Sequence, residues 1–394
     1  MKKVVCLLLA VVLLPVSCLI ADTFVSKENS NALHGYITGK VDAGLSDVNT
    51  LEKGLIKVNL NNYKVTRDRA GRSNIIALLE VPDEIATGLE TKAFEGAIAD
   101  AASKGPLFIL VEIDSPGGRV DLAMRMCSAI QKTTNCDVYA YIKGGQYGGA
   151  YSAAAALSLA CKKIYMSPGT VIGAATIITR NKEGKPVELK EVLGEKMGEK
   201  ISSGWRNYLA SLAENNNRSG ILAKAMEDKD IEVLEVEQNG KREFIDATNK
   251  KPEQTVIKIW SKKGSLLTLT ATEAVACGMA DKVYGNRQDL LQDANVLTAE
   301  IMPDKSMPKA RELCGRIENS LKKINASMDL GIKQLKATQS RSQAMKAMRS
   351  MMNDTQFVLG LKKKFGDDVP VDEEKVQSFL NSVQAEYESL MKSR

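Results

Sequence analysis

The most informative absence in this sequence of 394 residues is histidine, which occurs once. That residue, His34, lies in an N-terminal segment without clear periodicity. A Ser-His-Asp triad needs its histidine within hydrogen-bond reach of the serine. We therefore expect His34 to be an ordinary surface residue, and any serine hydrolase chemistry in this chain needs another base. Lysine is the usual substitute, because burial disfavours its charged form and the neutral amine can accept a proton.

Aromatic residues are also scarce, at 5% of the chain, and they are not interleaved with basic residues. Single-stranded nucleic acid is bound by aromatic rings that lie among positive charges, so we expect no nucleic-acid partner. The net charge of +6 is modest for this length. Much of the positive charge lies after residue 301.

The cysteines follow no metal-binding spacing. Two of the seven lie in the first 21 residues, which leaves five, an odd number without any C-x-x-C pair. We expect neither a zinc site nor a dense disulfide framework, and no cofactor is indicated. One disulfide remains an open alternative to five small buried apolar residues. The five are Cys127, Cys136, Cys161, Cys277 and Cys314.

Long hydrophobic runs are missing after residue 21, where no window reaches the length needed to cross a bilayer. The first residues, "MKKVVCLLLAVVLLPVSCLIAD", combine two lysines, an apolar run and small residues near a cleavage position. This pattern predicts an export signal over residues 1–21. Cleavage after Ala21, lipid attachment at Cys18 and an uncleaved anchor are the alternatives. We expect an exported protein of the periplasm or cell envelope, tethered to the membrane, if at all, at its N-terminus.

Three further regions follow the signal. Residues 22–73 are rich in Asn, Asp, Gly and Lys and are expected to form an irregular lead-in. From residue 74 to 300 apolar strand patterns such as "NIIALLEV", "LFILVEI" and "DVYAYI" alternate with helical patterns. Short glycine-rich connections between them predict an α/β core of parallel strands with flanking helices. Within it, residues 229–263 read as an inserted hairpin with Asn239-Gly240 at its turn. Residues 301–394 are expected to be a basic, all-helical extension.

Ser152 stands out among the candidate functional residues. It follows "GGQYGGAY" and begins the alanine-rich helical run "AAAALSLA". The first amides of a helix have no intrahelical acceptor and favour negative charge. The amide of Ala153, with a second from Gly117 or Gly118 in "DSPGG", would therefore suit an oxyanion. The competing interpretation is that Ser152 only caps the helix.

The segments "LVEIDSPGGRVDLAMRM", "GGAYSAAAAL" and "IYMSPGTVIGAATII" together resemble the serine-protease domain of NfeD-type membrane proteases. These are relatives of signal peptide peptidase A and the Clp protease subunit, and the resemblance spans about residues 74–295. It implies a ClpP/crotonase-like fold and a Ser-Lys dyad. In "EKISSGWRNYLASLAENNNRS" it assigns the base to Lys200, with Lys196 one helical turn earlier as the alternate. Ala154 departs from the glycine found at this place in many relatives, and its methyl group could crowd the site.

The resemblance implies an exported serine endopeptidase that cleaves extended, apolar peptide segments through an acyl-enzyme on Ser152. A polypeptide substrate, a homo-oligomer and a membrane-protein partner are expected with it. The first alternative is a catalytically inactive member that binds peptides or scaffolds an envelope complex. A second is a crotonase-like acyl-CoA enzyme, against which the export signal argues because CoA substrates are cytoplasmic.

Overall fold

The structure, a computed structural model, describes residues 22–392 except 41–44, 51, 67–73, 182, 295, 298, 331–339 and 370. The predicted export signal and Cys18 lie outside the described residues. The chain forms two compact units, residues 1–74 with 288–299 and residues 75–287 with 300–394. No helix among the described residues is long and apolar enough to cross a membrane.

The first unit corrects the expectation of an irregular lead-in. Five strands form an antiparallel sheet in the order β4-β3-β2-β1-β5. Its small core contains Phe24, Val48 and Val58. His34 lies on β2, where its Nδ1 is 2.6 Å from Oε1 of Glu52, and it is exposed as expected. The strands are β1 (Asp22–Ser26), β2 (Ala32–Lys40), β3 (Leu45–Thr50), β4 (Gly54–Asn59) and β5 (Tyr63–Thr66), with a 3-10 turn at Leu60–Asn62.

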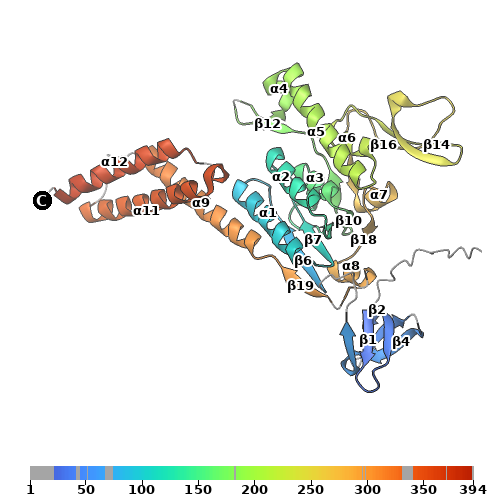
Figure 1. Ribbon diagram of the computed structural model, residues 1–394. Coiled ribbons are helices and arrows are strands. Elements are labelled where there is room, and N and C mark those ends of the chain that lie inside the picture. The colour runs from blue at the N-terminus through green and yellow to red at the C-terminus, as the bar shows by residue number, and fades with distance from the viewer. Residues whose placement is uncertain are drawn as a thin grey trace, which may run out of the picture. The chain divides into compact units, whose positions relative to one another are not determined.

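The second unit is built on a six-stranded parallel sheet in the order β18-β10-β8-β7-β6-β19 (Figure 1). All six residues of the central strand β7 are buried, as the continuous apolar pattern predicted for a sheet covered on both faces. The fold class expected from the sequence is therefore confirmed. The strands are β6 (Ile75–Val81), β7 (Phe108–Ile113), β8 (Asp137–Ile142), β10 (Lys163–Met166), β18 (Lys282–Val283) and β19 (Glu300–Pro303).

Helices that pack against the sheet and against one another enclose the main core. Thr87 caps the first of them by accepting a hydrogen bond from the amide of Glu90. The alanine-rich α3 is buried along its whole length, because small side chains let it pack closely against its neighbours. The extra methyl group of Ala154 is accommodated there with no exposed surface. The helices are α1 (Gly88–Ser103), α2 (Val120–Gln131), α3 (Ala153–Ala160), α5 (Glu195–Asn215) and α6 (Gly220–Glu227).

A second, three-stranded sheet in the order β17-β11-β9 positions the turn that carries Ser152. Its strands are β9 (Gly149–Tyr151), β11 (Val171–Gly173) and β17 (Thr268–Thr270). The smaller elements between α3 and the tail are β12 (Ile178–Arg180), β13 (Pro186–Glu188), α4 (Leu189–Leu193), α7 (Ala271–Ala276) and α8 (Arg287–Asp293).

The insertion contains the predicted hairpin and one strand more. β14 (Val233–Gln238) and β15 (Lys241–Asp246) meet at Asn239-Gly240, whose φ angles of 53° and 75° suit this tight turn. After a 3-10 turn at Ala247–Asn249, β16 (Thr255–Ser261) returns along the other side of β14.

From Ser306 the C-terminal segment is helical, as expected, but residues 301–303 of the expected all-helical extension belong to strand β19, which pairs with β6. Its first helix packs against α1, where Oγ1 of Thr87 lies 3.3 Å from Sγ of Cys314. Arg125 of α2 pairs with Asp368 at 3.1 Å, in the 3-10 turn at Gly366–Asp368. The division into a domain over 74–300 and an extension over 301–394 stays a prediction. The helices are α9 (Ser306–Leu330), α11 (Arg341–Phe365) and α12 (Glu373–Lys392).

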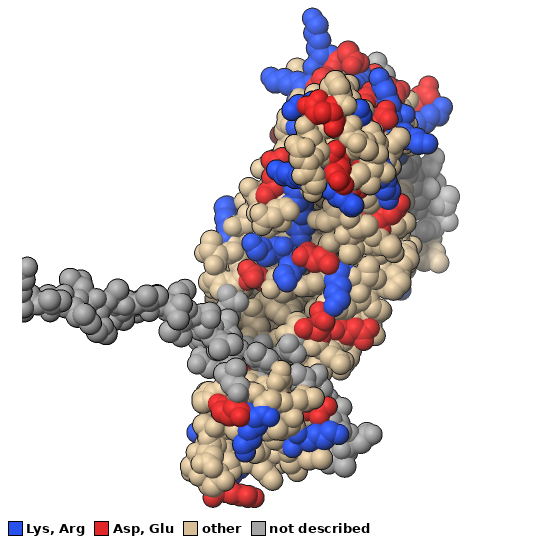
Figure 2. Space-filling model, turned by 90° about the vertical axis from the view of Figure 1, so that its right-hand side faces the viewer, with Lys and Arg blue, Asp and Glu red and all other residues tan. Residues whose placement is uncertain are grey.

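Charged residues are mixed over the face drawn in Figure 2, where basic and acidic side chains lie side by side. No broad field of one sign is visible there.

Candidate active site

The turn between β9 and α3 holds Ser152 in a strained backbone conformation. Its φ of 53° and ψ of −122° lie in a region that residues with a side chain rarely adopt. The Ser152 amide donates to the carbonyl of Gly173 at 2.9 Å, which ties the turn to β11. Although Ser152 occupies the N-cap position, its hydroxyl makes no capping hydrogen bond. The cap interpretation therefore lacks the contact that defines it, and strain of this kind is typical of functional turns.

The "DSPGG" segment lies directly beside this turn. The Ser115 amide donates to the Gly149 carbonyl at 2.8 Å, and the Tyr151 amide donates to the Ser115 carbonyl at 3.0 Å. A Cβ atom at Gly117, where φ is 96°, would lie 2.6 Å from Cβ of Ser152 and 2.9 Å from the Ala153 nitrogen. Only glycine fits at this position, so the two motifs are matched to each other in shape.

The backbone amides beside Ser152 differ in their availability. The Gly117 amide already donates to Oγ of Ser115 at 3.1 Å. Within the described part of the chain, no hydrogen bond is made by the amides of Gly118 and Ala153. Gly118 has a φ of 142° and packs against the backbone of Ile85. Two unused amides thus remain at the start of the two neighbouring helices.

Asp114 is a site residue that the sequence reasoning missed. It is 4% exposed, and its carboxylate accepts hydrogen bonds from the amides of Tyr147 at 3.1 Å and Gly149 at 3.2 Å. A Cβ at Gly145 would lie 2.5 Å from the same carboxylate. Asp114 therefore holds the "GGQYGG" loop that leads into β9. The sequence feature that could have identified Asp114 is an acidic residue that directly follows a buried strand and precedes Ser-Pro-Gly-Gly.

An ion cluster braces the ends of β7 and β8 near this loop. Glu112 is 2% exposed and lies 3.0 Å from Nζ of Lys143, and it also accepts from Nε of Arg287. Burial opposes the ionisation of Glu112, but Arg287 and Lys143 more than offset it, so the pKa of this carboxyl lies below its usual value. The cluster fixes the point where the chain leaves β8 for the glycine-rich loop.

The two candidate lysines lie on the exposed surface of α5. Both Lys196 and Lys200 are exposed, because the buried face of α5 is formed by residues such as Gly198, Ser202 and Trp205. Among the described residues neither lysine forms a hydrogen bond with Ser152. The structure therefore brings together Ser152, Ala153, Gly117 and Gly118, and leaves Lys196 and Lys200 in solvent.

The helix that carries the lysines is nevertheless linked to the serine turn. Nε1 of Trp205 donates to the Ala175 carbonyl at 2.8 Å, two residues beyond the Gly173 carbonyl that holds Ser152. The Ala175 amide in turn donates to the Met226 carbonyl at 2.5 Å. The loop after β11 therefore connects α5, α6 and Ser152.

Exposed apolar side chains surround the lysines. Along α4 and the start of α5, four large aliphatic residues are 41–52% exposed, an unusual density for a helix surface. Met197 and Ile201 lie one helical turn apart on α5, each directly after Lys196 or Lys200. Val192 and Leu193 end α4, just before the break at Gly194. These four residues form what we call the apolar stripe.

All five cysteines of the described chain are free, and four are buried. Burial raises the pKa of the Cys127 thiol to about 12 and that of Cys277 to about 11. No group of three or more His, Cys, Asp or Glu side chains in the described residues is arranged to hold a metal ion.

Part of this chain is similar to known proteins. Residues 75–257 match the family described as NfeD1b, N-terminal domain. The chain is 28% identical over 205 residues to the membrane protein NfeD1b of Bacillus subtilis, and 28% identical over 162 residues to the membrane-bound protease PH1510 of Pyrococcus horikoshii. These alignments cover 52% and 41% of this chain but only 38% and 34% of the two relatives.

Solved structures similar to this chain include two mutants described as 1510-N membrane-bound stomatin-specific protease. One carries a serine-to-alanine change, and the other carries a lysine-to-alanine change and is in complex with a substrate peptide. Both are 22% identical, with TM-scores of 0.44 and 0.45. They cover 59% of this chain, and 98% and 93% of their own chains.

Proposed function

Residues 75–257 belong to the NfeD1b N-terminal domain family, and from this premise we propose that the chain is a serine endopeptidase with Ser152 as its nucleophile. The observation that supports this most directly is the backbone of Ser152, with its φ of 53° and its uncapped hydroxyl at a strand-to-helix turn. Such a turn presents the hydroxyl outward while the following helix begins behind it. A serine that only capped the helix would need neither feature.

In the proposed reaction, Oγ of Ser152 attacks the peptide carbonyl and gives its proton to the neutral amine of a lysine. The tetrahedral oxyanion is held by backbone amides. We assign Ala153 and Gly118 to this role before Gly117, because the Gly117 amide is already bonded to Ser115. The lysine then returns the proton to the leaving amine, and a water molecule releases the acyl group from Ser152.

We propose Lys200 as the base, with Lys196 as the alternate. Only a neutral lysine amine can accept a proton, and loss of contact with water favours that neutral form, so the active state needs the amine to be desolvated. The apolar stripe supplies a reason for that loss. An apolar substrate segment that covers Leu193, Met197 and Ile201 would also desolvate the lysines between them.

This arrangement favours extended apolar peptides as substrates. A polypeptide substrate and a membrane-protein partner are proposed with it, since the two curated relatives are described as a membrane protein and a membrane-bound protease. A homo-oligomeric state is proposed as well. We further propose that the protein acts outside the cytoplasm.

Labelling with a fluorophosphonate, followed by intact-protein mass measurement, tests the nucleophile. The wild-type chain should gain one adduct, Ser152→Ala should gain none, and Ser103→Ala, which removes an exposed serine of α1, should label like the wild type. Cleavage of apolar peptides by Lys200→Ala should fall by at least about a hundredfold, while Lys196→Ala keeps most activity. The reverse result assigns the base to Lys196.

The alternative function is a catalytically inactive peptide-binding or scaffolding protein of the envelope. It is favoured by one observation, the exposure of both lysines. A wild-type chain that binds apolar peptides but neither cleaves them nor reacts with the fluorophosphonate between pH 6 and pH 10 would establish this alternative and refute the peptidase.

A further inference from the structure

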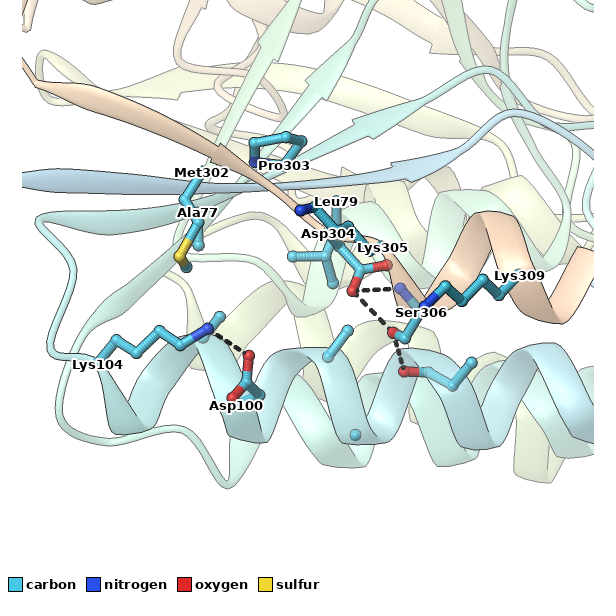
Figure 3. Close-up of a pocket in the computed structure, with 14 residues that line it drawn as sticks. Ala77, Leu79, Asp100, Lys104, Met302, Pro303, Asp304, Lys305, Ser306 and Lys309 are labelled. Atoms are coloured by element: carbon cyan, nitrogen blue, oxygen red, sulfur yellow. Dashed lines mark hydrogen bonds and ion pairs between the residues drawn. The ribbon is translucent and has the colours of Figure 1, made fainter.

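A groove of about 600 Å³ lies between α1 and the edge of the parallel sheet (Figure 3). Its apolar floor is formed by Met302 of β19, with Ala77 and Leu79 of β6, each 1% exposed, lying beneath. One wall is α1, and the other is the segment from Asp304 to Lys309 that begins α9. None of the residues proposed for peptide cleavage lines it, so it is independent of that function.

Small residues on α1 keep this groove open. Ala93, Gly96, Ala97 and Ala101 face it from successive turns of the helix. A Cβ added at Gly96 would meet no atom within 4 Å. The volume of the groove, about 600 Å³, is typical of small-molecule binding sites, and apolar residues line much of it, as they do in such sites. A side chain of ordinary size at residue 96 would fill part of it.

The charges around the groove are unbalanced. Asp100 is paired with Lys104 at 2.6 Å. The Asp304 carboxylate accepts hydrogen bonds from the amides of Ser306 at 3.0 Å and Met307 at 2.7 Å. Lys305 and Lys309 are exposed and form no ion pair with any described residue. Figure 3 shows Lys104 and Lys309 at opposite ends of the groove, so the excess positive charge lies at the α9 end.

The edge of the sheet is a poor place for an added peptide strand. β19 is the outermost strand, and it ends at Pro303, which has no amide hydrogen. Proline on an edge strand discourages pairing with another strand. The groove is therefore better suited to a ligand that needs apolar walls and a cationic end than to an extended backbone.

We propose that this groove binds a long-chain aliphatic carboxylate. The alkyl chain lies between the small-residue face of α1 and Met302, above the buried side chain of Leu79. The carboxylate lies near Lys305 and Lys309, where it balances the one positive charge by which the lysines that line the groove exceed Asp100 and Asp304. Asp100 and Asp304 can keep the hydrogen bonds and the ion pair described above when the alkyl chain and the carboxylate of the ligand are bound.

Titration calorimetry of the full chain with sodium laurate, kept below its micelle concentration, tests the site. Wild-type protein should bind one laurate, and dodecyltrimethylammonium, which has the opposite charge and an alkyl tail one carbon longer, should bind at least about tenfold more weakly. Gly96→Leu should abolish laurate binding by filling the groove. Gly360→Leu is the matched control, because Gly360 is also a helical glycine with open space around it, and it should bind like the wild type. Exchanging both lysines, Lys305→Glu with Lys309→Glu, should weaken laurate binding about fivefold or more.

Three results would each overturn the proposal. They are no laurate binding by the wild type, equal binding of the two detergents, and unchanged affinity in Gly96→Leu. Circular dichroism and thermal unfolding should show Gly96→Leu and Gly360→Leu to be folded, since leucine replaces glycine inside a helix in both. A Gly96→Met variant, with a more flexible side chain, provides a second way of filling the groove.

Discussion

The contact between Gly117 and Ser152 can be tested with a single methyl group. Replacing Gly117 by alanine places Cβ 2.6 Å from Cβ of Ser152, 2.7 Å from the Tyr151 carbonyl oxygen and 2.9 Å from the Ala153 nitrogen. Two of these atoms belong to the backbone and cannot rotate away. The turn that carries Ser152 must therefore move, or the "DSPGG" segment must.

Two effects should lower the free energy of unfolding of Gly117→Ala. The φ of 96° disfavours any residue with a Cβ by about 1–2 kcal/mol. Overpacking against a rigid neighbour adds about 1–3 kcal/mol. Gly169→Ala separates the two, because Gly169 has a similar φ of 80° but no atom within 4 Å of an added Cβ. Only the first cost should appear there, so the two variants should differ by about 1–3 kcal/mol.

Urea unfolding and fluorophosphonate labelling measure the two consequences. Gly117→Ala should unfold at a lower urea concentration than Gly169→Ala and should label far more slowly, even under conditions where it is fully folded. Equal unfolding midpoints for the two variants, or normal labelling of Gly117→Ala, would refute the claim that Gly117 shapes the serine turn.

Three further predictions concern the surroundings of the site. Asp114→Ala should destabilise the domain by about 1–3 kcal/mol, since it leaves the amides of Tyr147 and Gly149 without their acceptor, and urea unfolding that matches the wild type would contradict this. Glu112→Gln should cost about 1–3 kcal/mol at pH 7. Because the pKa of Glu112 is depressed in the folded chain from an ordinary value of 4.5, its stabilisation is present above that value and is lost as the pH falls through the folded pKa, so the difference from the wild type should shrink below about pH 4. Ellman's reagent should modify Cys314, which is half-buried, before Cys127, Cys161 or Cys277, whose burial blocks access. Burial raises the pKa of all four thiols, so access rather than ionisation decides the order, and mass mapping that finds Cys127 modified first would show this packing to be wrong.

Much of the second unit follows from local patterns. Continuous apolar runs separated by short glycine-rich turns predicted the parallel strands and their flanking helices, since each run is long enough to specify its own element. The position of Ser152 between a strand and a helix was predicted for the same reason. The Asn239-Gly240 turn likewise depends only on two adjacent residues.

The N-terminal sheet was missed because its signal is not local. Each of its strands is short and polar on one face, and it becomes a strand only by pairing with segments such as those around Phe24 and Val48. The same limit applies to Asp114, whose role depends on Tyr147 and Gly149, 33 and 35 residues further along the chain. The lysines are a third case, since periodicity placed them on a helix but could not show which face of α5 is buried.

The sequence by itself determined the order of the strands β6, β7, β8 and β10 with the helices between them, and the small residues that the serine turn requires. Those properties depend on neighbouring residues, whose preferences act over one strand or one helical turn. Only the tertiary structure decided that Gly117 packs against Ser152, that the Ser152 hydroxyl is left without a capping bond, and that Lys200 faces solvent beside the apolar stripe. These depend on contacts between distant segments, which form only when the whole core is packed.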